Sequence, residues 1–249
     1  MALSFETDKG LCARAALGLI VLQTDETIEP EFKWMINLDD VCLYHSRVPS
    51  GKEVTPQTLA LMEAEIPRAV NLLPSNAPLS VIGYACTSGS TVIGEDRIAQ
   101  AITSVFPGVA TTNPISAAKA ALYSLGVKRL AFVSPYVADV SLALQDNLEQ
   151  AGFKISSFSS FERIEEKVVT RITPKSVLDG ILAVGREQDC DGVFVSCTNL
   201  RVASIIEEAE KRLNKPVISS NQALAWHMLR LAGINDRIYG KGQLLKMPI

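Results

Sequence analysis

An apolar segment that ends in a cysteine occurs twice in this 249-residue chain, and the second copy lies 111 residues after the first. Residues 81–85 lead into Cys86, and residues 192–196 lead into Cys197; a threonine follows each cysteine. A short apolar run that ends in small polar residues is typical of a buried parallel strand, whose carboxyl end carries the residues that follow. We therefore expect the two cysteines to face each other across one active site.

Two other landmarks repeat with nearly the same step. Residues 111–113 (Thr-Thr-Asn) correspond to residues 219–221 (Ser-Ser-Asn) at a step of 108, and the strand that ends at residue 24 lies about 112 residues before the one that ends at residue 136. Because three landmarks share one offset, the sequence predicts two similar α/β halves related by a pseudo-two-fold axis. The cleft between the carboxyl ends of their sheets is the expected ligand site.

Strand-like and helix-like segments alternate through both halves. The predicted strands are residues 14–22, 41–48, 81–85, 108–111, 129–134, 154–161, 192–196 and 216–219. The predicted helices begin near residue 29 and then cover 55–72, 95–106, 115–125, 139–151, 174–187, 202–213 and 221–231. This alternation predicts an α/β fold in which each half is a parallel four-stranded sheet with helices on both faces.

The last helix of each half could cross over and pack on the other half. The first domain would then be discontinuous, with residues 1–113 plus 222–249 carrying Cys86 and residues 114–221 carrying Cys197. No linker rich in Gly, Ser or Pro separates the halves, which favours tight packing between them.

Composition narrows the classes of partner. The net charge is −3 and the 24 basic residues are scattered, which argues against a nucleic-acid surface. No apolar run approaches the roughly 20 residues that span a bilayer, and residues 1–10 do not resemble a signal peptide. We expect a cytoplasmic protein with a small-molecule partner, no nucleic acid and no membrane, and a homo-oligomer (dimer or tetramer).

The cysteine and histidine counts argue against two further classes of site. Five cysteines without a CxxC pair do not indicate a disulfide framework, and two histidines make a zinc site of usual composition unexpected. The chain has neither a phosphate-binding GxxxxGK[ST] loop nor a GxGxxG after a strand. We expect no metal and no cofactor.

The chemistry is expected to lie in Cys86 and Cys197. A thiol at a strand end before a helix can be ionised by nearby N–H groups and the helix dipole, and a pKa one to two units below the usual value of about 8.5 would make it reactive at neutral pH. Two such thiols could exchange a proton across a carbon, or one could add to a double bond. Cys12, Cys42 and Cys190 lack this context and are expected to be structural.

Small polar residues around the two cysteines could bind a carboxylate through hydroxyl, amide and backbone donors. These candidates are Thr87, Ser88, Thr198 and Asn199.

Two further candidates follow the first strand of each half. Asp25 could orient a substrate amine or move a proton, and Tyr136 could donate to a carboxylate or an enolate. Asn113 and Asn221 are expected to be helix N-caps, and the two histidines are expected to be structural.

The two cysteine motifs, Tyr-Ala-Cys-Thr-Ser-Gly at 84–89 and Val-Ser-Cys-Thr-Asn at 195–199, resemble those of the aspartate/glutamate/hydantoin racemase superfamily. The resemblance is greatest to its maleate cis-trans isomerase and arylmalonate decarboxylase branch, includes a tyrosine loop at 133–136, and covers nearly the whole chain. It implies flavodoxin-like halves and a cofactor-independent enzyme whose two thiols act on a carbon next to a carboxylate.

The chain departs from that branch at informative positions. The decarboxylases keep only the second cysteine, so the presence of both argues against decarboxylation. Typical maleate isomerases carry Ser-Asn where this chain has Thr24 and Asp25, and an aliphatic residue where it has Thr87. The charge of Asp25 would repel a second carboxylate and would suit an ammonium or amide group. This favours a racemase-like reaction, as in the subgroup associated with ectoine degradation.

Three alternatives stay open at this point. The first is maleate cis-trans isomerisation, with Cys86 adding to the double bond and Cys197 acting as the acid. The second is a non-catalytic protein that binds a small acid in the cleft. The third is a redox sensor, which would need the two Cα atoms within about 7 Å of each other.

Overall fold

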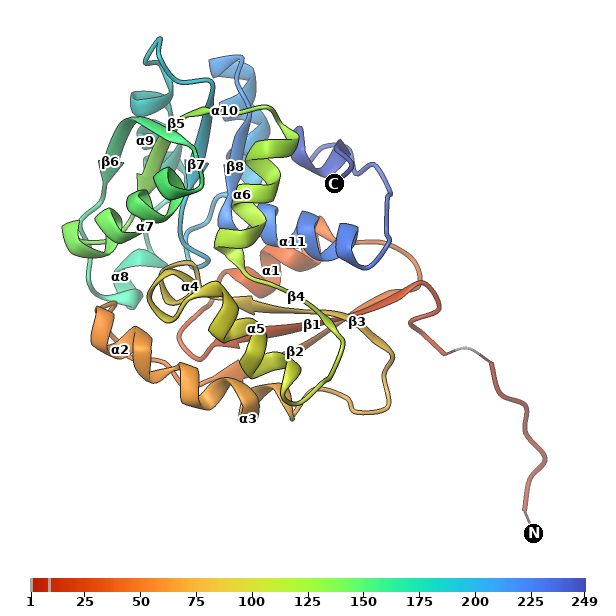
Figure 1. Cartoon of the computed structure of the whole chain (residues 1–249). Coiled ribbons are helices and arrows are strands. Elements are labelled where there is room, and N and C mark those ends of the chain that lie inside the picture. The colour runs from red at the N-terminus through yellow and green to blue at the C-terminus, as the bar shows by residue number, and fades with distance from the viewer. Residues whose placement is uncertain (1, 9) are drawn as a thin grey trace.

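Two parallel sheets with the same strand order form the framework of the chain, in a computed structural model that describes residues 2–8 and 10–249 (Figure 1). The first sheet has the order β2-β1-β3-β4 and the second has the order β6-β5-β7-β8. The strands are β1 (Ala15–Leu22), β2 (Val41–Val48), β3 (Leu79–Ala85), β4 (Ala110–Thr112), β5 (Arg129–Ser134), β6 (Lys154–Ser160), β7 (Gly192–Val195) and β8 (Val217–Ser219). The predicted pair of four-stranded α/β halves is confirmed.

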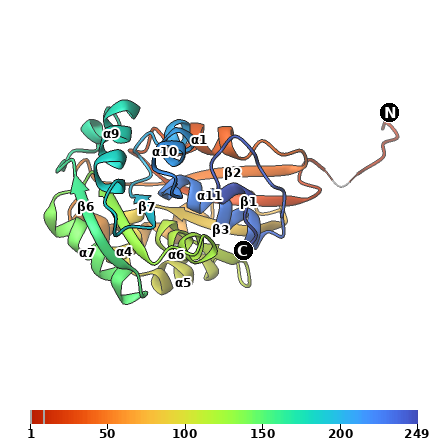
Figure 2. The same ribbon diagram turned by 90° about the horizontal axis from the view of Figure 1, so that it is seen from above.

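Helices lie on both faces of the strands, with α1, α9 and α10 on one side and α4 to α7 on the other (Figure 2). The helical segments are α1 (Ile28–Met35), α2 (Pro56–Leu61), η1 (Glu63–Glu65), α3 (Ile66–Val70), α4 (Thr87–Ile93), α5 (Glu95–Thr103), α6 (Pro114–Ser124), α7 (Ala138–Gln150), α8 (Glu166–Val169), α9 (Pro174–Gly185), η2 (Ala203–Ile205), α10 (Ile206–Leu213), α11 (Ser220–Leu231) and η3 (Leu244–Lys246). Because both faces are covered, every residue of β1 is buried. No helix among the described residues is long and apolar enough to cross a membrane.

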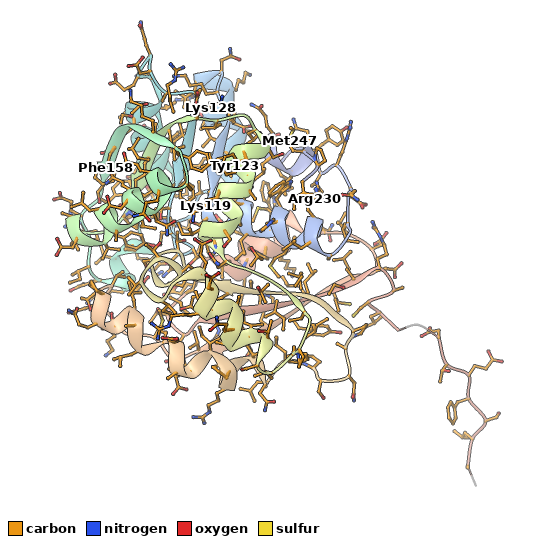
Figure 3. The ribbon with its side chains drawn as sticks, in the orientation of Figure 1. Lys119, Tyr123, Lys128, Phe158, Arg230 and Met247 are labelled. Carbon is orange, nitrogen blue, oxygen red and sulfur yellow. The ribbon has the colours of Figure 1, made fainter. Side chains whose placement is uncertain are left out.

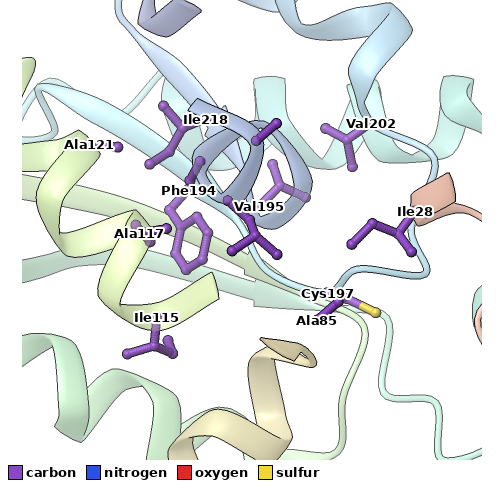
Figure 4. Packing of buried hydrophobic residues seen from close by; sticks show 14 of the residues in the cluster. Ile28, Ala85, Ile115, Ala117, Ala121, Phe194, Val195, Cys197, Val202 and Ile218 are labelled. Carbon is purple, nitrogen blue, oxygen red and sulfur yellow. The ribbon is translucent and has the colours of Figure 1, made fainter. Parts of the chain in front are cut away.

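The helices α6 and α11 each leave one sheet and pack against the other. α11 follows β8 but packs on β3, where a Cβ atom added at Gly83 would lie 2.8 Å from Sδ of Met228. α6 follows β4 and contacts β8, and its alanines lie beside Phe194 and Ile218 (Figure 4). The predicted discontinuous first domain, residues 1–113 plus 222–249, requires such an exchange of helices. The domain boundaries themselves stay a prediction.

The C-terminal segment returns onto α11. Arg230 donates from Nε to the carbonyl of Met247 at 2.9 Å and from Nη1 to that of Ile234 at 2.6 Å (Figure 3). Trp226 donates to the same Met247 carbonyl at 2.9 Å. Hydrogen bonds from a charged donor to carbonyls of an irregular segment satisfy backbone acceptors that no sheet or helix can pair.

Several predicted helix boundaries are wrong for local reasons. The predicted helix 55–72 is three segments, α2, η1 and α3, with Pro67 in the first turn of α3, where its missing N–H is tolerated. The helix after Cys86 begins at Thr87 rather than near residue 95, and Gly94 at φ +98° separates α4 from α5. The predicted helix 202–213 opens as the short 3-10 turn η2, and α8 was not predicted.

Substitution of two glycines of the second half by alanine should have opposite effects on the stability of the protein. At Gly192 an added Cβ would lie 2.6 and 3.0 Å from the γ-carbons of Val127, so Gly192→Ala should destabilise by about 1–3 kcal/mol. At Gly180, inside α9, the nearest atom would be 3.6 Å away, so Gly180→Ala should stabilise by about 0.5–1 kcal/mol. Urea unfolding followed by circular dichroism measures both, and shifts of the same sign would contradict this packing.

Candidate active site

Cys86 joins β3 to α4 and is the N-cap of that helix. Its backbone is extended, and its Sγ accepts the N–H of Gly89 at 3.2 Å, with Oγ of Ser88 at 3.7 Å. A Cβ atom at position 89 would lie 2.9 Å from Cys86 Sγ and 2.9 Å from the hydroxyl oxygen of Tyr84. Only glycine lets the helix begin this close to the thiol.

Cys197 follows β7 in a backbone conformation that is unusual for its type. Its φ is +110°, in a region that costs roughly 1–3 kcal/mol for a residue with a Cβ atom. Its Sγ accepts the N–H of Asn199 at 3.3 Å, and its own N–H donates to the hydroxyl of Ser220 at 3.0 Å. These hydrogen bonds hold the strained residue, so its thiol has a fixed direction.

The hydroxyl of Ser220 joins the two cysteine segments. It accepts the hydroxyl proton of Thr87 at 2.8 Å as well as the N–H of Cys197. Both cysteines are free thiols and each is only 3% exposed. The structure thus brings together two thiols that are far apart in the sequence.

Tyr136 is buried beside Cys197. Burial raises the pKa of its hydroxyl well above the usual value, and the nearby thiols of Cys197 and Cys86 raise it further. Three serine hydroxyls fix its loop through the backbone: that of Ser134 accepts the Tyr136 N–H at 3.3 Å, and those of Ser141 and Ser160 donate to its carbonyl. The tyrosine is therefore a neutral, positioned proton donor near both thiols.

Asp25 lies 3% exposed at the start of α1. Its Oδ1 accepts the N–H groups of Thr27 and Ile28, each at 2.8 Å, whereas its buried Oδ2 makes no hydrogen bond. Burial raises the pKa of this carboxyl, while the Ile28 N–H and the nearby Thr198 hydroxyl act in the opposite direction. One oxygen thus caps α1, and the other has no hydrogen bond of good geometry, although the Thr198 hydroxyl lies near the carboxyl group.

The remaining predicted site residues belong to the same buried cluster. Asn199 accepts the N–H of Glu26 at 3.0 Å, and its Nδ2 donates to the Thr24 carbonyl at 3.3 Å and to Oε2 of Glu166 at 2.9 Å. Thr198, next to Asp25, is also buried, as are Thr87 and Ser88. All eight residues predicted for the site are therefore in one place.

Glu166 is a site residue that sequence reasoning missed. It is half-buried at the start of α8, and burial raises the pKa of its carboxyl to about 7, with the charge of Asp25 adding to the shift. Five of the six residues at 162–167 are charged, a composition that is typical of a solvated loop. Only the contact with Asn199 distinguishes this glutamate from its neighbours.

Glu31 was also missed, and it holds the segment after Cys197 from the other half. Its Oε1 accepts the N–H groups of Val202 and Ala203 at 2.7 and 2.8 Å, and its Oε2 accepts Nδ2 of Asn221 at 2.8 Å. Asn221 also donates to the Thr198 carbonyl at 2.8 Å and is not an N-cap. Asn113, in contrast, caps α6 as predicted.

The expectation that the two thiols are readily ionised is wrong for this closed site. Burial raises the pKa of Cys86 to about 12 and that of Cys197 well above its usual value, and the charges of Glu166 and Asp25 raise both further. The N–H groups of Gly89 and Asn199 favour the thiolates but do not offset these effects. Both thiols are protonated at neutral pH in this state.

A cavity of about 500 Å³ lies outside the thiols, with Thr24, Glu26 and Glu166 among its lining residues. Two backbone hydrogen bonds between the halves lie beside this cavity. The N–H of Val54 donates to the carbonyl of Ile164 at 2.9 Å, and the N–H of Glu166 donates to the carbonyl of Lys52 at 3.2 Å. Within the described residues no group of three or more His, Cys, Asp or Glu side chains is arranged to hold a metal ion.

Comparisons with known proteins agree with this geometry. The profile of the arylmalonate decarboxylase family matches residues 75–245. A maleate isomerase of Pseudomonas putida is 28% identical over 92% of this chain and 96% of its own, and one of Nocardia farcinica is 26% identical over 92% and 95%. A crystal structure of a maleate isomerase from Pseudomonas putida with maleate superposes with a TM-score of 0.84, at 25% identity over 93% of this chain and 97% of that chain.

The raised thiol pKa values predict slow alkylation of Cys86 and Cys197 by iodoacetamide at about pH 7, slower than that of the partly exposed Cys12. The rate at both sites should rise about tenfold per pH unit to beyond about pH 9, because the thiolate is the reactive form. Peptide mapping by mass spectrometry measures each site. A rate that levels off below about pH 8 would show that burial and the two carboxylates do not raise the pKa values of these thiols.

The pKa of Glu31, raised by burial from 4.5 to about 7, predicts that the folded state binds more protons than the unfolded state between these values. The free energy of unfolding should therefore fall as the pH rises through this range. The variant Glu31→Gln should show a weaker fall. Urea titrations at several pH values measure both slopes, and parallel curves for the two proteins would contradict the assignment.

Proposed function

Because the chain belongs to the arylmalonate decarboxylase family, whose maleate isomerases it resembles along nearly its whole length, we propose that it is a cofactor-independent isomerase or racemase. It acts at the carbon next to the carboxylate of a small amino acid or dicarboxylic acid. Cys86 and Cys197 are the catalytic residues. The observation that carries the proposal is the pair of buried thiols at equivalent strand ends, joined through Ser220.

The reaction replaces one proton of the α-carbon by another. One cysteine, as the thiolate, removes the proton from the α-carbon, and the electron pair of the broken C–H bond spreads into the carboxylate as an enolate. The thiol on the opposite face donates its proton to the same carbon, which inverts the configuration. The enzyme ends with the proton on the first sulfur and the negative charge on the second, and the reverse reaction uses them in the opposite order.

The polar residues around the thiols hold the substrate carboxylate and its enolate. The hydroxyls of Ser88 and Thr198, with Thr87 and Asn199 beside them, form the cradle, and the neutral hydroxyl of Tyr136 donates to the developing charge. Preformed donors are effective in a closed site because no water competes with them.

Maleate cis-trans isomerisation is the alternative, favoured by the names of the relatives. In this reaction the Cys86 thiolate adds to one carbon of the double bond, and Cys197 gives its proton to the other carbon. Rotation about the new single bond follows. The Cys197 thiolate then takes a proton back, and the C–S bond breaks to release the trans acid.

A non-catalytic acid-binding protein is a further alternative, which predicts stabilisation by the ligand without a product.

The test of the isomerase is deuterium from the solvent appearing at the α-carbon of an amino acid during turnover. Mass spectrometry and NMR measure it over a panel of small amino acids and dicarboxylic acids. Cys86→Ala and Cys197→Ala should each lower the exchange rate by about 100-fold or more, because each removes one of the two proton-transfer groups.

Cys190→Ala is the matched control, because Cys190 is also buried but its thiol faces the carbonyls of Gly185 and Glu187, away from the site. It should leave the rate unchanged within about twofold. Full activity in either the Cys86 or the Cys197 variant would refute the two-thiol mechanism. Conversion of maleate to fumarate without any α-proton exchange in amino acids would favour the alternative.

A further inference from the structure

Asp25 presents a free carboxylate oxygen inside the site. Both N–H groups at the start of α1 bind Oδ1, so Oδ2 has no part in capping the helix. Oδ2 is buried without a hydrogen bond, which is costly for a carboxylate unless a further partner arrives. The Asp25 carboxyl lies near the hydroxyl of Thr198, the residue after Cys197, and its charge disfavours both thiolates.

Glu166 approaches the same site from the second half. The side chain of Asn199 connects the two acids, since it donates to Glu166 and also holds the carbonyl of Thr24 and the N–H of Glu26, the two neighbours of Asp25. The charge of Glu166 also acts on both thiols. Each half of the protein therefore supplies one carboxylate and one thiol to a single compartment.

The basic residue that acts on Asp25 is already engaged. Arg47 donates to the carbonyls of Leu22 and Asp25 at 2.8 and 3.0 Å and pairs with Glu29 at 2.6 Å. At the mouth of the site, Arg171 pairs with Glu26 at 2.8 Å on exposed side chains. Lys52 and Lys167 also line the outer cavity, where Lys167 pairs with Glu165 rather than with Glu166. The strongest charges acting on the thiols are thus the two carboxylates, with no arginine bound to either carboxylate among the described residues.

We infer that the substrate carries a positively charged nitrogen and that Asp25 and Glu166 bind it, with Oδ2 of Asp25 as one acceptor. This inference rests on the proposed function for the position of the reacting carbon between the thiols. An ammonium group gives the free oxygen a donor and offsets part of the negative charge of the two carboxylates, whereas the second carboxylate of a dicarboxylic acid would be repelled by them. The substrate class is therefore an amino acid rather than a dicarboxylic acid such as maleate.

Binding of the cation would also prepare the chemistry. Two carboxylates disfavour a thiolate, and an ammonium group placed against them removes much of that repulsion. The substrate would thereby lower the pKa of the thiol that must remove its proton. An acid that lacks the amine would bind weakly and would leave both thiols protonated.

The nitrogen could be the α-amino group or an amino group at the far end of the chain, toward the cavity that Glu166 and Glu26 line. A series of acids with one carbon skeleton separates these sources: valerate, norvaline, 5-aminovalerate and ornithine, with maleate for comparison. Isothermal titration and thermal unfolding measure binding to the Cys86→Ser/Cys197→Ser protein, which lacks both thiols and cannot turn the ligands over.

Ornithine, and either norvaline or 5-aminovalerate, should bind at least about tenfold more tightly than valerate and maleate, as expected for a charge-assisted hydrogen bond. Norvaline binding indicates the α-amino group, and 5-aminovalerate binding indicates the distal one. Asp25→Asn and Glu166→Gln should each remove about tenfold or more of that preference. Both variants should fold, because Asn keeps Oδ1 for the α1 N–H groups and Gln keeps an oxygen for Asn199.

Glu149→Gln is the control, because it removes a negative charge from an exposed side chain near the end of α7 that does not line the cavity. It should change binding by less than about twofold. Equal or tighter binding of maleate or valerate, or no binding of any amine-bearing acid at about 10 mM, would overturn the inference. Amine-selective binding without deuterium exchange in the unmodified protein would refute the proposed reaction and leave the cation subsite standing.

Discussion

The hydroxyl of Ser220 accepts one hydrogen bond from each of the two segments that carry the thiols, and the geometry of the site depends on it. Ser220 is the first residue of α11, which leaves β8 of the second sheet and packs on β3 of the first. Both donors are buried, so each would lose a partner that water cannot replace if the hydroxyl were absent. Because Ser220 belongs to α11, the packing of this helix on the first sheet holds the Cys86 and Cys197 segments at a fixed distance from each other.

Burial has opposite consequences for the two kinds of acidic group in the site. Burial stabilises the neutral form of the thiols, which is the form that donates a proton to the substrate carbon in the proposed reaction. For Asp25 and Glu166 it raises the free energy of a charge that the fold has not paired with a basic side chain. The cationic ligand inferred above would place a positive charge directly against these two carboxylates, which no arginine or lysine of the described residues does.

The sequence pattern was sufficient for the architecture and for the core of the site. Strands that are buried on both faces are nearly continuous apolar runs, so β1, β3, β5 and β7 could be predicted directly. The shared offset of the repeated landmarks predicted two similar halves, which the structure shows to have the same strand order. The eight predicted site residues follow strand ends, where parallel topology places ligand-binding residues.

What the sequence did not reveal depends on contacts between distant segments. α4 consists of small polar residues and glycine at its start, a composition with little helical preference, and it forms because Cys86 caps it and the two halves bury it. Glu31 and Glu166 gain their roles only where they meet residues of the other half or the cysteine loop, more than 30 positions away. The thiol pKa was misjudged because the sequence shows the helix start but not the depth of burial.

The two halves are equivalent in strand order but not self-sufficient in chemistry. The first supplies Cys86 and Asp25, and the second supplies Cys197 and Glu166, while Asn199 ties Glu166 to the turn that contains Asp25. A substrate carbon between the thiols needs a donor and an acceptor on opposite faces, which one half alone cannot provide. In the proposed reaction, the pseudo-symmetry of the two halves places one thiol on each face of the substrate carbon, so the two thiols can exchange roles when the direction of proton transfer reverses.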